Sequence, residues 1–439
     1  MNPGRLLVAL LIVTGLVGAL ISGAAFYTHL FVLGLLLVAA SWLWVRVVAR
    51  SIRVSRKPDF HRASVGDIFK EQYDLENTGR LPGMWVELYN EMPLPTAAGS
   101  WLLTRLLPHQ KQSFVARTWL TRRGGFPVGP TVVKVSDPLG LFRAERTFPP
   151  ERSLVILPMI VPLESFLTRP GMIPGGAVIR RRTMDITPHA AGVREYIAGD
   201  PMKRIHWPSS ARRGALMVKE FEQDPQAEVW LFLDAQRKVQ AQKAFETPVM
   251  PLENLLFSRR PKLTLAPSTL EYAISIAASL AHYFIGERRA VGLVTEDRNY
   301  TVLAAERSER QENKILETLA FVEGRGDLPL PALVSAQARQ LPQGSNVILI
   351  TPSTSLDLIL VSDDLQRRNL RPVVILLVAD SFGGAPGSQR LAQQLAGQRV
   401  PVCLIHCDAN LAQELSNFSS DNPSQDATTW QRPTLSHLT

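Results

Sequence analysis

The chain has 439 residues, enough for about two or three domains with cores of their own, and 46% of its residues are hydrophobic, as in ordinary globular protein. Its formal net charge of +9 favours acidic partners such as anionic lipid or nucleic acid, but it does not indicate a fold. The two cysteines, Cys403 and Cys407, exclude a disulfide framework and fit a reducing compartment. Their C-x3-C spacing, with no histidine at ligand spacing, indicates two packed thiols rather than a metal site.

The amino terminus predicts two transmembrane helices within residues 1–52. No residue from Leu6 to Val45 is charged, and a helix that spans a bilayer needs about 20 apolar residues, so this run is long enough for two. We expect the break between them near residues 27–30, where polar atoms cluster. The alternative is a cleaved signal peptide over residues 1–24, in which case the second apolar stretch would stop transfer.

Positive charge flanks the apolar run. Arg5 precedes it, and a cationic cluster follows it at Arg46, Arg50, Arg53, Arg56 and Lys57. Because such residues stay on the cytoplasmic side, we expect a multi-pass protein of the cell inner (plasma) membrane whose soluble domains are cytoplasmic. Membrane lipids are expected partners of residues 5–57, since each cation near anionic headgroups contributes up to about 1 kcal/mol.

Residues 53–165 predict an antiparallel β-sandwich of immunoglobulin-like architecture. Within residues 69–77, apolar and polar side chains alternate as in a half-buried strand, and only Glu71 breaks the period of two. Further strands are expected at residues 84–90, 113–121, 131–137 and 153–158, between turns rich in Gly, Pro and Asn. The stretch RRGGFPVGP, residues 122–130, is interpreted as a hairpin turn rather than a binding loop.

Residues 228–416 predict an α/β domain. Apolar runs of strand length alternate with helical patterns, which is typical of a parallel, doubly wound (Rossmann-like) sheet covered by helices. The expected strands are residues 227–234, 290–296, 300–306, 346–351, 372–380 and 400–406, and the expected helices are residues 268–286 and 308–322. Ser268 and Glu271 predict a capping box at the start of the first helix. Residues 239–266 form a long insertion, functional or disordered, and residues 417–439 predict a disordered tail.

The common catalytic motifs are missing from the sequence. It contains no GxxxxGK[ST] phosphate loop, no HExxH zinc motif and no GxSxG nucleophile elbow. The glycine-rich residues 171–176 predict a flexible linker rather than a phosphate cradle. We therefore expect no catalytic residue and no cofactor.

The segment REYIAGDPMKRIHWPSSARRG, residues 194–214, is dense in charge and lies in residues 166–227, which join the two predicted soluble domains. Asp200 and Pro201 predict the start of a short helix that Gly214 ends, and a strand is expected on either side of this helix. We expect Ile205 to face inward and Arg213 to face outward.

Three roles stay open for this segment. Ion pairs of Arg194, Arg204 and Arg212 with Asp200, Glu195 and Glu220 could lock two domains together, with Trp207 buried as a wedge. The segment could instead dock a partner protein or lipid. It could also bind phosphate, but Trp207 is the one aromatic side chain suited to base stacking, so no nucleic acid is expected.

These residues resemble the signature of the "domain of unknown function 58" family, and RRGGFPVGP and DPLGLF resemble two further landmarks of it. The resemblance implies a membrane anchor, a last domain similar to a von Willebrand factor type A domain, and a MoxR-type AAA+ ATPase as partner. The matching positions, structural or partner-docking in role, are Arg194, Tyr196, Gly199, Asp200, Arg204, Ile205, Trp207, Ser210, Ala211, Arg212, Lys219, Phe221 and Glu222.

Type A domains that bind metal carry an adhesion site that is degenerate here. Only Asp234 is retained, and Arg237 and Lys238 stand where a divalent ion needs oxygen ligands. The later loop, residues 324–330, has no threonine, and Thr351-Pro352-Ser353 replaces the carboxylate after the fourth strand. We expect no functional metal site.

We therefore expect a membrane-anchored, cytoplasm-facing interaction or scaffold protein that works with this ATPase in the assembly or maturation of other proteins. The alternative is a hydrolase or another enzyme that binds an anionic ligand through the basic residues 194–219. A clustered acid–base pair would favour the enzyme.

Overall fold

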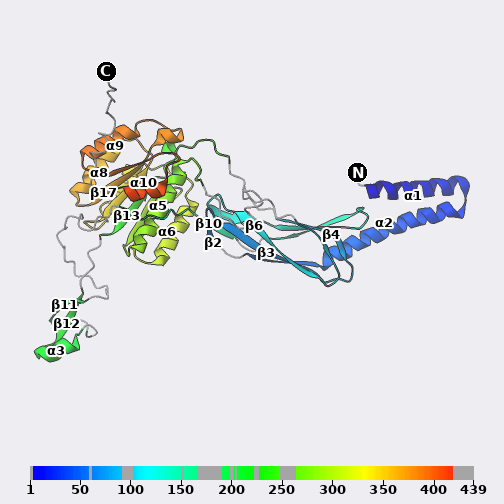
Figure 1. The fold of residues 1–439 in the computed structure, drawn as a ribbon, viewed down its shortest axis with the longest axis horizontal. Helices are drawn as coiled ribbons and strands as arrows, with labels where there is room; N and C mark the ends of the chain where they lie inside the picture. The colour runs from blue at the N-terminus through cyan, green and yellow to red at the C-terminus, as the bar shows by residue number, and fades with distance from the viewer. Residues whose placement is uncertain are drawn as a thin grey trace, which may run out of the picture. The chain divides into compact units, whose positions relative to one another are not determined.

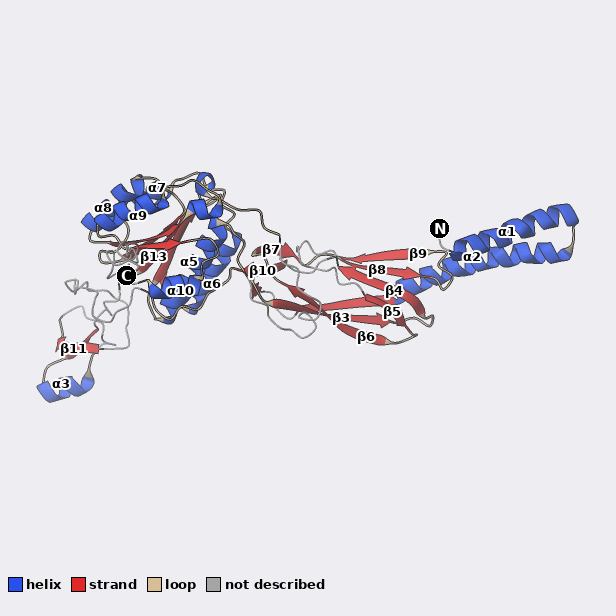
Figure 2. Ribbon diagram, turned by 45° about the horizontal axis from the view of Figure 1, so that its top comes forward, coloured by secondary structure: helices blue, strands red, loops and turns tan. Residues whose placement is uncertain are grey.

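The computed structural model describes residues 3–58, 62–90, 102–149, 153–166, 190–197, 202, 205–221, 227–246 and 264–418. The chain divides into two compact units. The first is made of Met1–Val161, Ala241–Ser279 and Asn313–Gly324, and the second of Pro162–Gln240, Leu280–Glu312 and Arg325–Thr439. Two apolar helices at the amino terminus are followed by several sheets and helices, as Figures 1 and 2 show, so the expected multidomain chain with β-rich regions is observed.

The amino terminus forms a helical hairpin of α1 (Pro3–Ser22) and α2 (Ala25–Ser51). Both helices are long and apolar enough to span a membrane. The break lies at Gly23 and not at residues 27–30, which belong to the start of α2. Gly23 has a φ of 65°, a left-handed conformation that glycine adopts without strain and that ends a helix. The polar side chains of Tyr27 and His29 do not mark the break between the helices, because α2 accommodates both of them in its first turns.

The strands of the first unit form three sheets, in the orders β1-β3-β6, β5-β4-β8-β9 and β2-β10-β7. Their bounds are Ile52–Pro58 (β1), Arg62–Ser64 (β2), Ile68–Asn77 (β3), Gly83–Asn90 (β4), Leu102–Leu106 (β5), Lys111–Trp119 (β6), Gly124–Pro127 (β7), Thr131–Ser136 (β8), Arg143–Phe148 (β9) and Ser153–Leu157 (β10). The strands expected from alternation are present. The stretch interpreted as a turn at residues 122–130 contains β7, which pairs with β10.

Helix α2 runs into strand β1 without a loop, and its end is part of the β core. Val48, Ala49 and Ile52 are buried in one hydrophobic cluster with side chains of β3 and β6 from the first sheet and of β4, β5 and β8 from the second. The helix therefore completes the core between these two sheets.

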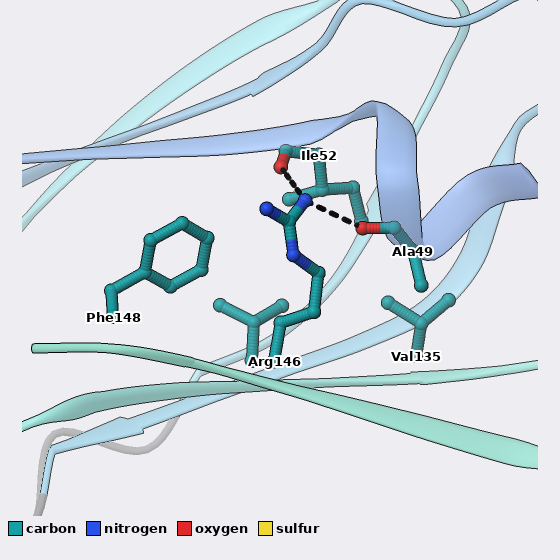
Figure 3. A pocket seen from close by; sticks show the side chains of 6 residues that line it. Ala49, Ile52, Val135, Arg146 and Phe148 are labelled. Carbon is teal, nitrogen blue, oxygen red and sulfur yellow. Dashed lines mark hydrogen bonds between the residues drawn. The ribbon is translucent and has the colours of Figure 1, made fainter. Parts of the chain in front are cut away.

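Arg146 of β9 fixes this helix end through its guanidinium (Figure 3). One terminal nitrogen lies 3.0 Å from the carbonyl oxygen of Ala49 and 3.3 Å from that of Ile52, and the guanidinium lies 5.2 Å from the Phe148 ring centroid. A cation at the last carbonyls of a helix complements both their unpaired lone pairs and the helix dipole. The side chain thus joins α2 to the second sheet.

Glu71, the residue that interrupts the alternation in β3, is 1% exposed and is paired inside the first unit. Its carboxylate accepts hydrogen bonds from Arg56 at 2.9 and 2.5 Å and from the Tyr73 hydroxyl at 3.2 Å. Burial raises the pKa of Glu71, and Arg56 opposes that rise. The strand tolerates an inward carboxylate because β1 supplies its cation.

Arg123, in the RRGG stretch, is the buried cation of a second cluster in the first unit. Its guanidinium donates to the carbonyl oxygens of Leu319 and Val322 at the end of helix α6 (Glu309–Phe321), and it pairs with Glu271 in the first turn of helix α5 (Thr269–Gly286). Glu271, expected in a capping box, thus pairs with a residue far away in the sequence. The arrangement satisfies a buried charge with three acceptors.

The second unit holds a six-stranded sheet in the order β15-β14-β13-β16-β17-β18, in which only the edge strand β15 is antiparallel to its neighbour. Its strands are Val229–Leu233 (β13), Val291–Glu296 (β14), Tyr300–Glu306 (β15), Asn346–Thr351 (β16), Arg371–Leu377 (β17) and Val402–Ile405 (β18). All of these strands were expected from the sequence. Strands β14 and β16 lie on opposite sides of β13, so the sheet reverses its order between β13 and β16.

Helices α7 (Leu330–Gln337), α8 (Asp357–Arg367) and α9 (Ser388–Gly397) share one hydrophobic cluster with strands β13, β14, β16 and β17. Further helical elements of the described residues in this unit are α10 (Leu411–Asn417) and the short 3-10 turns η2 (Arg237–Val239) and η3 (Ala379–Phe382). Helices α7 to α10 were not anticipated, because they are short.

Replacing Arg123 tests the buried cluster. We expect Arg123→Met to lower the free energy of unfolding by about 2–4 kcal/mol, because hydrogen bonds to a charged group contribute about 1.5–3 kcal/mol each. The measurement is denaturant unfolding of the detergent-solubilised chain. The control is Arg122→Met, which removes an exposed neighbouring cation and should change stability by less than about 0.5 kcal/mol. Equal effects of the two variants would contradict this account of Arg123.

Candidate functional site

The signature segment folds as a strand pair with a helix between its strands (Figure 1). Strand β11 (Ala190–Glu195) pairs antiparallel with β12 (Met217–Phe221), and helix α3 (Trp207–Arg213) lies in the connection. Backbone hydrogen bonds at 2.8 Å, from Tyr196 N to Leu216 O and from His206 N to Met217 O, hold the connection against β12. The strand–helix–strand order expected from the sequence is therefore confirmed.

The inside of this module is small. Ile205, Met217 and Val218 are buried, and Ile205 faces inward as expected. The Ser210 hydroxyl oxygen accepts a hydrogen bond from Met217 N at 2.8 Å and donates to His206 O at 3.1 Å. Ser210 therefore connects α3 to β12 and has a structural role.

The helix begins later than the sequence indicated. Helix α3 starts at Trp207, with Pro208 in its first turn, and the expected cap at Asp200 and Pro201 lies outside the described residues. Ile205 forms a β-bridge with Val218, which excludes helix there. Gly214 ends the helix as expected, with a φ of 65°.

Trp207 was expected to be a buried wedge, and this is wrong, because 65% of its surface is exposed. The module's core is formed by Ile205, Met217 and Val218, so Trp207, at the first position of α3, remains outside it. Three further large apolar side chains of the module are also exposed: Ile197 (59%), Met202 (69%) and Leu216 (43%). The module thus presents apolar surface.

Cations accompany this apolar surface. Arg212 and Arg213 are exposed at the end of α3, and the exposure of Arg213 was expected. No Asp or Glu occurs in residues 201–219 of the sequence. Tyr196 is half-buried, Ala211 is exposed, and Arg194, Lys219 and Phe221 take part in the strand pairing through their backbones. Gly199, Asp200, Arg204 and Glu222 lie outside the described residues, as do the side chains of Arg194 and Glu220, so the expected interdomain ion pairs stay predictions.

A second candidate lies in the sheet, where its strand order reverses between β13 and β16. In open α/β sheets ligands bind beyond the carboxyl ends of the strands at such a point. Asp234 follows β13 there and is 1% exposed. Its carboxylate accepts a hydrogen bond from the Thr351 hydroxyl at 2.5 Å and another from Gln236 N at 3.0 Å. Thr351 in turn accepts one from Ser353 N at 2.9 Å.

Gly326 packs closely against the residues that follow Asp234 and against the end of β14. Gly326 N donates to Ala235 O at 3.0 Å, Arg237 N donates to Gly326 O at 2.8 Å, and a side chain at Gly326 would clash with the carbonyl oxygen of Glu296. The loop that contains Gly326 therefore lies against the loop after β13.

These residues do not fit a divalent cation. Both oxygens of Asp234 accept hydrogen bonds, and the exposed residues that follow are the cations Arg237 and Lys238. Within the described parts of the chain, no three His, Cys, Asp or Glu side chains gather in a group that could hold a metal. Burial raises the pKa of Asp234 to about 6, so its carboxyl takes up a proton more readily than an exposed one.

The two cysteines are free. Cys403 is buried in β18, and burial raises the pKa of its thiol to about 12, so it stays protonated at neutral pH. Cys407 is half-buried. A protonated buried thiol is a poor nucleophile, so we assign Cys403 a packing role.

Comparison with known proteins finds a family match in the signature segment. The model of the family described as "Protein of unknown function DUF58" matches residues 192–247. The uncharacterized protein YeaD of Bacillus subtilis (strain 168) is 25% identical over 194 residues, which are 42% of this chain and 48% of that protein. The chain is thus matched over about half the length of this relative.

Two of the solved structures that match do so over about a quarter of the chain. The CARDB domain of the PF1109 protein from Pyrococcus furiosus is 11% identical, and the match covers 24% of this chain and 91% of that one with a TM-score of 0.19. The complex of zinc 2-glycoprotein and prolactin inducible protein from human seminal plasma matches at 14% identity, 24% and 92% coverage, and a TM-score of 0.18. At these scores neither likeness informs the fold or the function.

The buried carboxyl of Asp234 predicts a pH dependence of stability. Its pKa of about 6 lies above the 3.8 of an exposed aspartate, so the folded chain binds the proton more tightly. The stabilisation is complete below pH 3.8 and is lost as the pH rises through 6. Going from pH 8 to pH 5 should raise the unfolding free energy of the natural chain by about 1 kcal/mol relative to Asp234→Asn. Urea unfolding of both chains at the two pH values measures this, and a difference independent of pH would contradict it.

Proposed function

Because the chain belongs to the family described as protein of unknown function DUF58, we propose that it is a membrane-anchored docking protein with cytoplasmic domains. Its proposed partner is a MoxR-type AAA+ ATPase, with which it acts in the assembly or maturation of other proteins. The partner comes from the family resemblance, and the docking role comes from the signature module. The process itself is not specified by this proposal.

The exposed apolar and cationic surface of α3 is the observation that carries the proposal. Trp and Arg are the side chains most enriched among residues that dominate binding energy at protein interfaces. Here Trp207, Arg212 and Arg213 lie on one short helix, in a stretch of sequence without acidic residues. The matching partner surface is an apolar pocket bordered by carboxylates.

We assign the two soluble parts to finer fold classes within the same proposal. The hydrophobic cluster shared by the sheets β1-β3-β6 and β5-β4-β8-β9 supports a β-sandwich. The order of the six-stranded sheet, with Asp234 after β13, supports a von Willebrand factor type A-like domain that has lost its metal site. Such a domain would serve as an interaction module without an ion.

The orientation of the membrane hairpin is proposed from charge. Arg5 lies at one end of the hairpin, and Arg46 and Arg50 lie at the same end on α2, while neither Lys, Arg, Asp nor Glu occurs at the turn around Gly23. Because Lys and Arg flanking short spans remain cytoplasmic, the turn faces the opposite side of the inner membrane.

Reporter fusions test this orientation. A phosphatase reporter, active only outside the cytoplasm, should be inactive when fused after Thr439 and active when inserted at Gly23. A cytoplasm-active fluorescent reporter at the same positions should give the reverse pattern. An active phosphatase at Thr439 would overturn the cytoplasmic placement of the soluble domains.

Substitution of Trp207 tests the docking role. Trp207→Ala should weaken binding of the purified ATPase to the full chain in nanodiscs by at least about tenfold, as hot-spot truncations cost about 2 kcal/mol or more. Its stability should change by less than about 0.5 kcal/mol, because the side chain is exposed. Leu360→Ala on α8, where the leucine is 70% exposed, is the matched control and should bind normally.

Either of two results would contradict the docking role. One is a large loss of stability in Trp207→Ala with unchanged binding, which would make the segment a structural joint. The other is turnover of an anionic ester substrate that Arg212→Gln abolishes, which would favour the alternative of an enzyme. Arg122→Gln, at an exposed arginine of the first unit, serves as the charge control.

A further inference from the structure

The turn between β8 and β9, residues 137–142, contacts the beginning of the membrane hairpin. Arg5 Nε donates to Leu141 O at 3.0 Å. A side chain at Gly4 would clash with Leu139 O, so the first turn of α1 and this turn touch backbone to backbone. The contact joins residues more than 130 positions apart in one compact unit.

Hydrogen bonds within the β8–β9 turn stabilise its conformation. Asp137 is fully buried, and its carboxylate accepts hydrogen bonds from Leu139 N at 3.0 Å and Phe142 N at 2.8 Å. Gly140 has a φ of 68°, which favours glycine. Leu139 nevertheless leaves 43% of its surface exposed. A leucine is thus held outward by a rigid turn.

The packing of the hairpin places this turn at the level of the membrane surface. Gly18 lies against Tyr27, Gly15 against Phe31, and Gly34 against Ile12. Continuing this antiparallel register brings Gly4 level with about residue 42 of α2. The apolar run is bounded by Arg5 and Arg46 at the same end, so the turn meets the hairpin where the run begins.

The side chains at this level are those of a membrane interface. Trp42 is 50% exposed, and the Arg46 guanidinium lies 5.4 Å from its ring centroid. Tryptophan and arginine are enriched where helices leave a bilayer. Arg143, directly after the turn, is exposed. Cations therefore occur both on the hairpin, at Arg5 and Arg46, and directly after the turn, at Arg143, where lipid phosphates would lie.

The geometry points to a third membrane contact besides the two helices: the β8–β9 turn rests in the headgroup layer, with Leu139 against lipid. The occupant of this surface is the bilayer itself, because the surface is continuous with the hairpin and carries the opposite charge to phosphate. The inference rests on the proposed membrane anchoring. It would fix the β sheets relative to the bilayer and not merely tether them.

Spin labels on the full chain in nanodiscs test this contact. Single cysteines are placed at Leu139, at Val115 in the middle of β6 and at Leu36 in α2, all with Cys407→Ser; Cys403 is buried and stays unlabelled. Val115 is the matched control, since it is 49% exposed but pairs with Gln72, five residues from the end of β3 nearest α2. Collision with oxygen, which enters lipid, is compared with collision with a water-soluble nickel chelate.

The expected result is a high oxygen-to-nickel ratio at Leu36, a low ratio at Val115, and a ratio at Leu139 that is severalfold above that at Val115. Equal ratios at Leu139 and Val115, with Leu36 in lipid, would overturn the contact and leave the membrane anchor intact. A low ratio at Leu36 would overturn the anchor and the contact with it. Leu139→Ser, as a second variant, should leave stability nearly unchanged and weaken oxygen access of a label at Arg143.

Discussion

The direct passage of helix α2 into strand β1 is the constraint on which the first unit depends. Val48, Ala49 and Ile52 fill the space between two sheets, and Arg146 binds the carbonyls at the end of the helix. A membrane helix on a flexible linker would leave the soluble part free to fold alone. Here the helix end is part of the core, so a truncation at residue 53 would remove core side chains and uncover apolar surface. The anchor and the β region therefore form one folding unit.

Three buried charged groups of the described residues each have hydrogen-bonding partners inside the protein. Glu71 forms an ion pair with Arg56. Arg123 forms an ion pair with Glu271 and donates hydrogen bonds to carbonyl oxygens at the end of α6. Asp234 accepts a hydrogen bond from Thr351. Arg123 and Asp234 are bonded to residues 196 and 117 positions away, and Glu71 is bonded to Arg56 on the paired strand, 15 positions away. Each contact favours the arrangement that satisfies the buried group over arrangements that would leave it without a partner. The contrast is the signature module, whose aromatic and cationic side chains on α3 are exposed. That contrast is why we assign α3 a docking role and the other charges a structural one.

The spacing of apolar side chains and the continuous apolar runs made the longer strands and helices predictable from the sequence. The strands of the six-stranded sheet are continuous apolar runs, and β3 alternates strictly enough to be recognised despite Glu71. What failed depended on tertiary contacts. The short strand β7 and the role of Arg123 are set by partners far away in the sequence, and the exposure of Trp207 follows from which side chains occupy the module's core. The sequence does contain the glycine that ends the first helix, Gly23, but the polar side chains at residues 27–30 led us to place the break there. In the candidate site, the inward position of Ile205 and the outward position of Arg213 were predicted correctly, but the exposure of Trp207 was not.

The central claim is that α3 is a docking surface and not a joint between domains. A photo-crosslinking amino acid in place of Trp207, in the full chain in its native membrane, tests this most directly. The account predicts an intermolecular adduct with the AAA+ ATPase, lost when Arg212 and Arg213 are both replaced by glutamine. An intramolecular crosslink to residues 228–418 would contradict it, because the tryptophan would then lie against the chain's own α/β region.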